Sequence, residues 1–340
     1  PIIAAPFRGI CKNINIIVAT SGDTGAAAID AIKGKKNVNI FVLHPHNKVS
    51  PVQRKIMSTV KENNVFNIAI EGNFDDCQNL VKAMFADKDF SNSINMSGVN
   101  SINWARIIAQ AVYYFYTYFL IKDKKSINFS VPTGNFGDVY AGYLSKKMGL
   151  PINKLIVATN KNDILHRAIS TGKYEVETVF ETNSPSMDIQ VASNFERLIY
   201  DLNDFDDIET KDVMIKIKDE GKYIFAKNRL EKIRKDFLSE SMNEEEVIET
   251  IKNIYDKYKV ILDPHTAIGL GALNKINIEG DNIVLATAHP CKFPDAIDKS
   301  ISIKPSLPSE LQYIMDKKEY YDIVPNNVSK TKQYIKDKLK

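Results

Sequence analysis

Three loops rich in glycine and hydroxyl-bearing residues carry the residue types best suited to binding a small ligand. They are Thr-Ser-Gly-Asp-Thr-Gly (residues 20–25), Thr-Gly-Asn-Phe-Gly-Asp (residues 133–138) and Thr-Ala-His-Pro (residues 287–290). Each follows a short apolar run that is typical of a strand. Ligands of parallel α/β sheets bind beyond the carboxyl ends of the strands. Position and composition therefore agree on three candidate parts of one site.

The loop at residues 133–138 is the one best suited to a phosphate monoester. Gly134 and Gly137 are separated by two residues, a spacing that allows a tight turn whose N–H groups converge on an anion at a helix start. The loop lacks the Gly-Lys-Ser/Thr ending of a Walker A sequence and the Gly-x-Gly-x-x-Gly spacing of dinucleotide folds. For the loop taken alone, an ordinary strand-to-helix turn stays an equal alternative.

The other two loops are weaker when each is taken alone. Glycines in the first allow close approach of the backbone to a ligand, and Ser21 and Thr24 add hydroxyl donors. Taken alone, this segment is better explained as a capped helix start, with Asp23 or Thr24 as the N-cap. In the third loop, the hydroxyl of Thr287 could meet a heteroaromatic nitrogen or a substrate oxygen. Together, a phosphate loop and a hydroxyl for a ring nitrogen predict a phosphorylated heteroaromatic cofactor.

Other classes of site and partner are disfavoured by the sequence. Cys11, Cys77 and Cys291 share no ligand-like spacing, and His-Pro-His (residues 44–46) has no third ligand nearby, so we expect no metal and a reducing, cytoplasmic location. Lys+Arg 45 against Asp+Glu 42 gives a net charge of +3 and no reason to expect a nucleic-acid partner. The most apolar run, residues 107–121, is shorter than the roughly 20 residues of a membrane span.

The elements that must position these loops alternate along the chain. Its 340 residues suggest two domains, which we place at 1–103 and 104–340, with a helical insertion at about 189–258. Apolar rather than alternating strands predict an α/β fold with parallel sheets covered on both faces. Strands are predicted at 14–19, 38–43, 65–70, 127–131, 155–159 and 283–286, and helices at 26–32, 51–60, 75–85, 107–121 and 137–148. The stretch after Pro305 is expected to wrap the surface, with a solvated helix at its end.

Seven stretches, in order along the chain, also match a known family. They are Ala-Thr-Ser-Gly-Asp-Thr-Gly-Ala-Ala-Ala (19–28), Val-Ser-Pro-Val-Gln (49–53), Asn-Ser-Ile-Asn-Trp-Ala-Arg (100–106), Val-Pro-Thr-Gly-Asn-Phe-Gly-Asp (131–138), Ala-Thr-Asn-Lys-Asn-Asp (158–163), Ser-Pro-Ser-Met-Asp-Ile (184–189) and Ala-Thr-Ala-His-Pro (286–290). On these the chain resembles threonine synthase of the long bacterial and fungal type. That family uses pyridoxal 5′-phosphate (PLP) and has the tryptophan-synthase-β fold, PLP fold type II.

The resemblance implies that O-phospho-L-homoserine and water are converted to L-threonine and phosphate, the last step of threonine biosynthesis. It also implies roles for residues in the matching stretches. The cofactor phosphate would be held by Gly134, Asn135, Phe136, Gly137 and Asp138, and the ring nitrogen by Thr287. Substrate binding would fall to Ser21, Asp23 and Thr24, with Asn160, Asp163, Ser184 and Ser186 as second choices. The expected partner is this small-molecule substrate, without nucleic acid or membrane; the oligomeric state is not predicted.

One feature of the family has no counterpart in the matching order. Its Schiff-base lysine lies in a Phe-Lys-Asp sequence before the Ser-Gly-Asp-Thr-Gly turn, whereas the residues before Ser21 contain no such sequence. Lys88, in Asp-Lys-Asp-Phe, lies after the turn and is a poor candidate. We therefore expect the chain to correspond to the carboxy-terminal three-quarters of a family member. We assign no residue as the Schiff-base lysine and make no prediction of whether the chain by itself turns over substrate. Three alternatives remain: a related phospho-lyase, a non-catalytic remnant that binds PLP or another metabolite, and a nucleotide-binding module that would bind ATP at residues 134–137.

Overall fold

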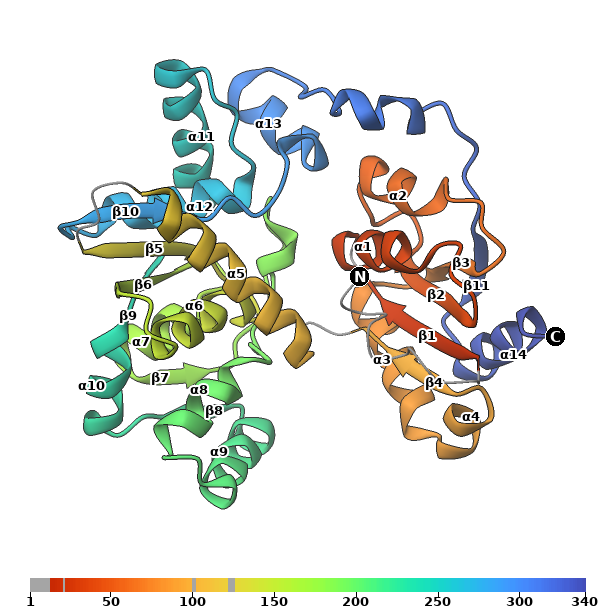
Figure 1. Ribbon diagram of the computed structural model, residues 1–340, viewed down its shortest axis with the longest axis horizontal. Coiled ribbons are helices and arrows are strands. Elements are labelled where there is room, and N and C mark those ends of the chain that lie inside the picture. The colour runs from red at the N-terminus through yellow and green to blue at the C-terminus, as the bar shows by residue number, and fades with distance from the viewer. Residues whose placement is uncertain (1–12, 21, 100–101, 122–125) are drawn as a thin grey trace. The chain divides into compact units, whose positions relative to one another are not determined.

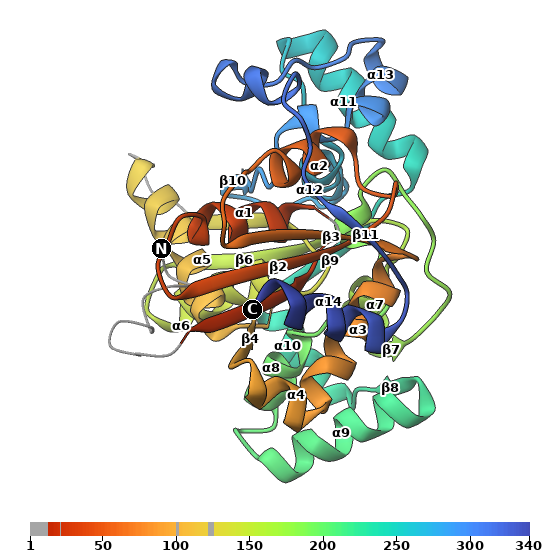
Figure 2. The ribbon, with the colours of Figure 1, turned by 90° about the vertical axis from the view of Figure 1, so that its right-hand side faces the viewer.

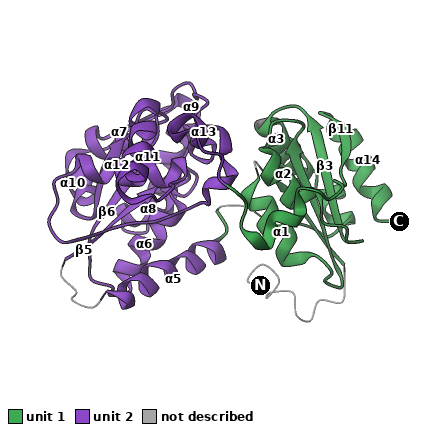
Figure 3. Ribbon diagram, turned by 90° about the horizontal axis from the view of Figure 1, so that it is seen from above, with its two compact units in different colours: residues 1–103, 306–340 green, residues 104–305 purple. Residues whose placement is uncertain are grey.

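The computed structural model describes residues 13–340 except 21, 100–101 and 122–125. The chain divides into two compact units, coloured separately in Figure 3. Unit 1 comprises residues 1–103 and 306–340, and unit 2 comprises residues 104–305. The first division falls after Asn103, where the sequence placed it. The expectation that the second domain runs to residue 340 is wrong, because residues 306–340 return to unit 1.

Unit 1 is a five-stranded parallel sheet with helices on both faces (Figure 1). Its strands, in sheet order, are β11 (Asp322–Pro325), β3 (Val65–Glu71), β2 (Val38–Pro45), β1 (Ile14–Ala19) and β4 (Met96–Gly98). Its helices are α1 (Asp23–Ile32), α2 (Pro51–Ser58), α3 (Phe74–Ala86), α4 (Lys88–Ser93) and α14 (Val328–Lys338). Alternate residues of β1 enter two different apolar clusters, Ile16 with Ile29 of α1 and Ile17 with Leu80 of α3. This two-sided burial explains the uninterrupted apolar strands.

The C-terminal segment completes unit 1. Its strand β11 pairs in parallel with β3, and α14 packs beside α3 (Figure 2). Val324 and Ile335 are buried in the same apolar cluster as Leu43. Before the strand, Arg54 of α2 binds Glu319 through two hydrogen bonds, Nε to Oε2 at 2.8 Å and Nη2 to Oε1 at 3.1 Å. The segment is therefore part of the fold of unit 1 and does not merely wrap its surface.

Unit 2 is built on a four-stranded parallel sheet. In sheet order its strands are β10 (Asp281–Val284), β5 (Ile127–Pro132), β6 (Ile152–Thr159) and β9 (Phe237–Ser241). The helices α5 (Trp104–Leu120), α6 (Gly137–Lys147), α7 (Ile164–Thr171), α12 (Pro264–Lys275) and α13 (Pro294–Ile301) belong to this unit. β7 (Lys173–Glu175) pairs antiparallel with β8 (Lys222–Ile224). The core lies around β5 and β6, whose residues Phe129, Val131, Leu155 and Val157 are fully buried.

The stretch 189–258 is only partly the helical insertion that its composition predicts. It holds α8 (Phe195–Leu202), α9 (Asp207–Glu220), α10 (Lys227–Asp236) and α11 (Glu244–Tyr258), but also β8 and β9. β9 belongs to the central sheet, where it pairs with β6. Its sequence Phe-Leu-Ser-Glu-Ser is not an apolar run because β9 is an edge strand and only Phe237 is fully buried.

Hydropathy does not indicate a membrane span in the part of the chain that the structure describes. The most apolar helix, α5, has 17 residues, and no described helix is both long and apolar enough to cross a bilayer.

Candidate functional site

The loop between β5 and α6 is fixed to the sheet at its first residue and to the core at its fourth. The Thr133 N–H donates to the carbonyl of Ala158 at 2.8 Å, and the Thr133 hydroxyl donates to the carbonyl of Val131 at 2.6 Å. Phe136 has a left-handed backbone (φ 64°), which is uncommon for a bulky residue. Its buried ring lies 5.0 Å from the ring of Phe195 and 5.6 Å from that of Phe237. Packing of this ring therefore stabilises the turn that starts α6.

The residues of this loop fit a phosphate group. A Cβ on Gly134 would lie 2.8 Å from the carbonyl oxygen of Ser186 and 3.2 Å from the Cα of Met187, so no side chain fits there. The residue that precedes α6, Phe136, supplies no side-chain cap to the first turn. Uncapped N–H groups at a helix start bind phosphate through hydrogen bonds and through the helix dipole. The loop thus offers backbone donors where the sequence predicted them.

The segment after η2 (Pro185–Met187) holds the loop from one side. The Asn194 N–H donates to the carbonyl of Asn135 at 3.1 Å, and the Ser193 N–H lies 3.4 Å from Asn135 Oδ1. Asn194 is fully buried, and its Nδ2 would lie 3.3 Å from a Cβ on Gly137. The side chain of Asn135 therefore takes part in holding the loop's shape.

Asp138, in the first turn of α6, is a half-buried carboxylate. The hydroxyl of Tyr114 on α5 donates to its backbone carbonyl at 2.8 Å and to Oδ1 at 3.2 Å. Burial raises the pKa of Asp138 from 3.8 to about 6, and the Tyr114 hydrogen bond only partly offsets this. A carboxyl group that is easily protonated disfavours a neighbouring anion less than an ordinary aspartate does.

Thr287 follows β10 and lies at the same edge of the sheet as the phosphate loop. β10 pairs in parallel with β5, with Val284 opposite Ser130, so both chains leave the sheet side by side. A Cβ on Gly269 of α12 would lie 2.9 Å from Val284 Cγ1 and 3.1 Å from Pro132 Cγ, which shows how closely the two strand ends approach one helix. Thr287 is exposed, and no described group bonds its hydroxyl. The structure therefore brings the predicted phosphate loop and the predicted ring-nitrogen residue to one edge.

Asn160 and Ser184 belong to a buried network beside this edge. Asn160 Nδ2 lies within hydrogen-bonding distance of Thr182 Oγ1 (2.9 Å), Ser184 Oγ (2.9 Å) and Asp188 Oδ1 (2.8 Å). Asp188 also accepts from Asn162 Nδ2 at 3.0 Å, and burial raises its pKa. Asn160 and Ser184 are almost completely buried. These bonds fix the segment that carries Ser186 and Met187 against Gly134.

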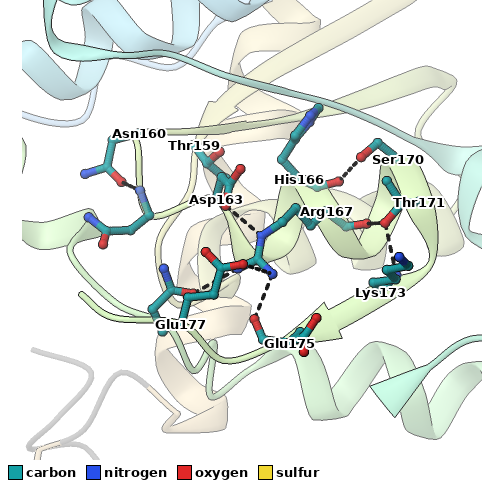
Figure 4. Close-up of polar contacts among 12 residues, drawn as sticks. Thr159, Asn160, Asp163, His166, Arg167, Ser170, Thr171, Lys173, Glu175 and Glu177 are labelled. Carbon is teal, nitrogen blue, oxygen red and sulfur yellow. Dashed lines mark hydrogen bonds and ion pairs between the residues drawn. The ribbon is translucent and has the colours of Figure 1, made fainter. Parts of the chain in front are cut away.

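Asp163 and Ser186 lie in different surroundings from those two residues. Asp163 Oδ1 accepts from Arg167 Nε at 2.8 Å, and Arg167 Nη1 lies 3.1 Å from Glu177 Oε1 (Figure 4). Asp163 thus has a cationic partner of its own on α7. Ser186 is exposed, next to Gly134. Substrate binding by the four second-choice residues stays a prediction, for which Ser186 is the most accessible of them.

The first predicted loop, residues 20–25, belongs to unit 1. Ser21 lies outside the described residues, and Asp23 begins α1. The Thr20 hydroxyl accepts hydrogen bonds from the N–H groups of Gly22 and Gly25, both at 2.9 Å. Gln53 Nε2 donates to Asp23 Oδ1 at 3.1 Å, and Thr24 is half-buried. The loop is thus a structured strand-to-helix turn, with polar side chains at the carboxyl end of β1.

Arg106, on the first turns of α5, is a candidate that sequence reasoning missed. It is half-buried, and no carboxylate among the described residues pairs with its guanidinium. Burial lowers its pKa from the ordinary value, although arginine stays charged at any physiological pH. The neighbouring Ile107 and Gln110 lie within 4 Å of a Cβ built on Gly137, so this end of α5 adjoins the phosphate loop. The signal was available, since Arg106 ends one of the matching stretches, but burial without a partner is visible only in the structure.

Comparison with known proteins identifies the family of the chain. The profile of the family "Pyridoxal-phosphate dependent enzyme" matches residues 2–225, and that of "Threonine synthase, C-terminal" matches residues 266–335. The chain is 46% identical to the threonine synthase of Pseudomonas aeruginosa, over 95% of this chain and 70% of that protein. It is 44% identical to the threonine synthase of Saccharomyces cerevisiae, over 98% of this chain and 70% of that protein.

Solved structures give the same result. A PLP-bound threonine synthase from Brucella melitensis matches with a TM-score of 0.94 and 44% identity, over 99% of this chain and 73% of that one. The threonine synthase of Escherichia coli matches with a TM-score of 0.77 and 29% identity, over 96% of this chain and 71% of that one.

Proposed function

The chain belongs to the threonine synthase family of PLP-dependent enzymes of fold type II, and from this premise we propose how its residues serve that activity. The reaction converts O-phospho-L-homoserine and water to L-threonine and phosphate. The Cγ–O bond breaks and phosphate leaves with the electron pair, while the hydroxyl of water is added at Cβ and its other proton goes to the phosphate. Of the protons that leave Cα and Cβ, one returns to Cα and one is added at Cγ, which becomes the methyl group. When bound, the conjugated ring of PLP takes up the electrons released as protons leave Cα and Cβ.

We propose that the backbone N–H groups of residues 134–138 hold the phosphate of PLP. The observation that carries this assignment is the uncapped start of α6 behind a glycine with no room for a side chain, at the same sheet edge as Thr287. The exposed hydroxyl of Thr287 would bond the ring nitrogen. Because a hydroxyl is neutral, it keeps that nitrogen less firmly protonated than a carboxylate would.

The substrate phosphate requires a cation, and we propose Arg106 for it. A half-buried guanidinium that no carboxylate pairs with, within the described part of the chain, can bind a phosphate group through two parallel hydrogen bonds and is little screened by solvent. Ser186, beside Gly134, would add a hydroxyl donor. At the loop of unit 1, the hydroxyls of Ser21 and Thr24 suit the substrate carboxylate, and Asp23 suits its amine.

The test is an assay of the purified chain with PLP and O-phospho-L-homoserine. We expect saturable binding of PLP by calorimetry, and any turnover should release phosphate and L-threonine in equal amounts. Gly134→Val should weaken binding of PLP by at least about tenfold, because the added carbons overlap the Ser186 carbonyl. Gly221→Asn is the matched control, since its site is open and asparagine tolerates the left-handed backbone found there (φ 72°).

The other outcomes identify the alternatives. Release of a keto acid with phosphate would indicate the related phospho-lyase. Binding of PLP without turnover would favour a non-catalytic binding protein for this chain. Unchanged affinity for PLP in Gly134→Val would refute the phosphate loop itself.

We also propose a reducing, cytoplasmic location. Of the described cysteines, Cys77 and Cys291 are both free and buried. Free thiols of this kind are usual where glutathione keeps cysteine reduced.

A further inference from the structure

The backbone of Thr287 is held by a side chain and not by the sheet. The ladder between β10 and β5 continues as far as the Leu285 N–H, which donates to the carbonyl of Ser130 at 3.0 Å. Two residues later, the Thr287 N–H donates to the hydroxyl oxygen of Thr266 at 3.3 Å. Thr266 lies in the first turn of α12 and is buried. The position of Thr287 therefore depends on a side chain from another element.

Asp263 orients the hydroxyl that accepts this hydrogen bond. The Thr266 hydroxyl donates its hydrogen to Asp263 Oδ2, which leaves only its lone pairs for the Thr287 N–H. Asp263 precedes α12 as its N-cap, and its Oδ1 accepts from the N–H of His265 at 2.9 Å and from that of Thr266 at 3.4 Å. With its side chain 1% exposed, Asp263 has no room to reorient.

The helix that carries these groups is itself fixed against the strands. Gly269 lies so close to the ends of β10 and β5 that even a Cβ would contact Val284 and Pro132. The Ser130 hydroxyl on β5 donates to the carbonyl of Gly269 at 2.6 Å. The start of α12 is therefore a rigid support for the residues that follow β10.

We propose that Asp263 and Thr266 are positioning residues for Thr287. Asp263 orients the Thr266 hydroxyl, and that hydroxyl fixes the Thr287 backbone so that the exposed Thr287 hydroxyl faces the ring nitrogen of the cofactor. This inference rests on the proposed role of Thr287. It differs from the role of the phosphate loop, because loss of the Thr266 hydroxyl should disturb the ring of the cofactor and leave the phosphate contacts intact.

The experiment uses pyridoxine 5′-phosphate labelled with ¹⁵N in its ring, which binds without forming a covalent bond, and inorganic phosphate as a second probe. Thr266→Val removes the hydroxyl and keeps the shape of the side chain. We expect it to weaken pyridoxine 5′-phosphate by about five- to tenfold, as for loss of one hydrogen bond, and to shift the ¹⁵N resonance toward that of the free probe. Affinity for inorganic phosphate should not change, and Thr266→Ser, which keeps the hydroxyl, should restore both readouts.

A double-mutant cycle with Thr287→Val separates the possible outcomes. If Thr266 acts through Thr287, Thr266→Val has no further effect once Thr287 is replaced. Additive effects, or an unchanged ¹⁵N resonance in Thr266→Val alone, would overturn the inference. If Thr287→Val itself leaves the resonance unchanged, the role proposed for Thr287 fails instead. Thr331→Val removes another buried threonine hydroxyl, in unit 1, and serves as the control. Thr266→Ala replaces the valine variant if that variant does not fold.

Discussion

Asp138 makes the start of α6 sensitive to pH. Its pKa in the folded protein, about 6, lies above its ordinary value of 3.8, so the folded state keeps its proton to higher pH than the unfolded chain does. Stability therefore falls as pH rises from about 4 to about 6 and stays lower above that. We expect Asp138→Asn to remove this loss, since the amide oxygen can still accept from Tyr114.

Chemical unfolding of unit 2 at several pH values checks this expectation. The gain in Asp138→Asn should vanish below about pH 3 and reach at most about 3 kcal/mol above pH 6, with partial exposure reducing that figure. Asp212→Asn, at an exposed position of α9, is the control and should show no such pH dependence. A constant difference across the range would mean that the carboxyl group is not the cause.

At the scale of elements, the network around Asn160 holds one wall of the phosphate loop. Asn160→Ala removes the amide group that contacts the side-chain oxygens of Thr182, Ser184 and Asp188. Because these oxygens are shielded from water, we expect the free energy of unfolding to fall by about 2–4 kcal/mol. Amide exchange should quicken in residues 180–190, and affinity for inorganic phosphate should fall. Asn253→Ala, at an exposed position of α11, should have little effect. Unchanged exchange in residues 180–190 would contradict this account.

The elements also show what sequence reasoning could and could not predict. Strands buried on both faces, such as β1 and β5, are recognisable in the sequence as apolar runs. The glycine-rich loops that follow these strands are predictable from the same stretches of sequence. The edge strand β10 is recognisable in the same way, whereas other edge strands are not. β9 and β11 are each paired on one side only and carry mixed sequences. Composition therefore predicts a helical insertion in place of β9 and a surface wrap in place of β11. Contacts between residues far apart in sequence, such as Thr266 with Thr287, leave no pattern in composition or spacing.

At the scale of the whole molecule, Glu319 connects the C-terminal segment, residues 306–340, to α2 of unit 1. The hydrogen bonds from Arg54 hold the pKa of this carboxyl below its ordinary value of 4.5, so it contributes stability above that pH, and the contribution is lost as pH falls through the lowered pKa. We expect Glu319→Gln to destabilise unit 1 by about 1–3 kcal/mol at pH 7.

Hydrogen exchange measured by mass spectrometry can resolve the two units. Glu319→Gln should quicken exchange in β11, β3 and α2, and leave β5 and β6 unaffected. Below the lowered pKa of Glu319, the variant and the original chain should become equally stable. Glu310→Gln, at an exposed position of the same segment, is the control. An equal effect on both units would show that they do not unfold separately.

Unit 1 is built from two separate segments of the chain, so it cannot finish folding during translation until its second segment has been synthesised. β11, the partner of β3, is translated only after residues 104–305 have been made, roughly 10–40 s later at about 5–20 residues per second. For that interval the backbone groups along one side of β3 lack their partner strand, and such an edge invites pairing with another nascent chain. Unit 2 is continuous in sequence, so its sheet can be completed before β11 is synthesised. We therefore expect unit 2 to finish folding before unit 1 does.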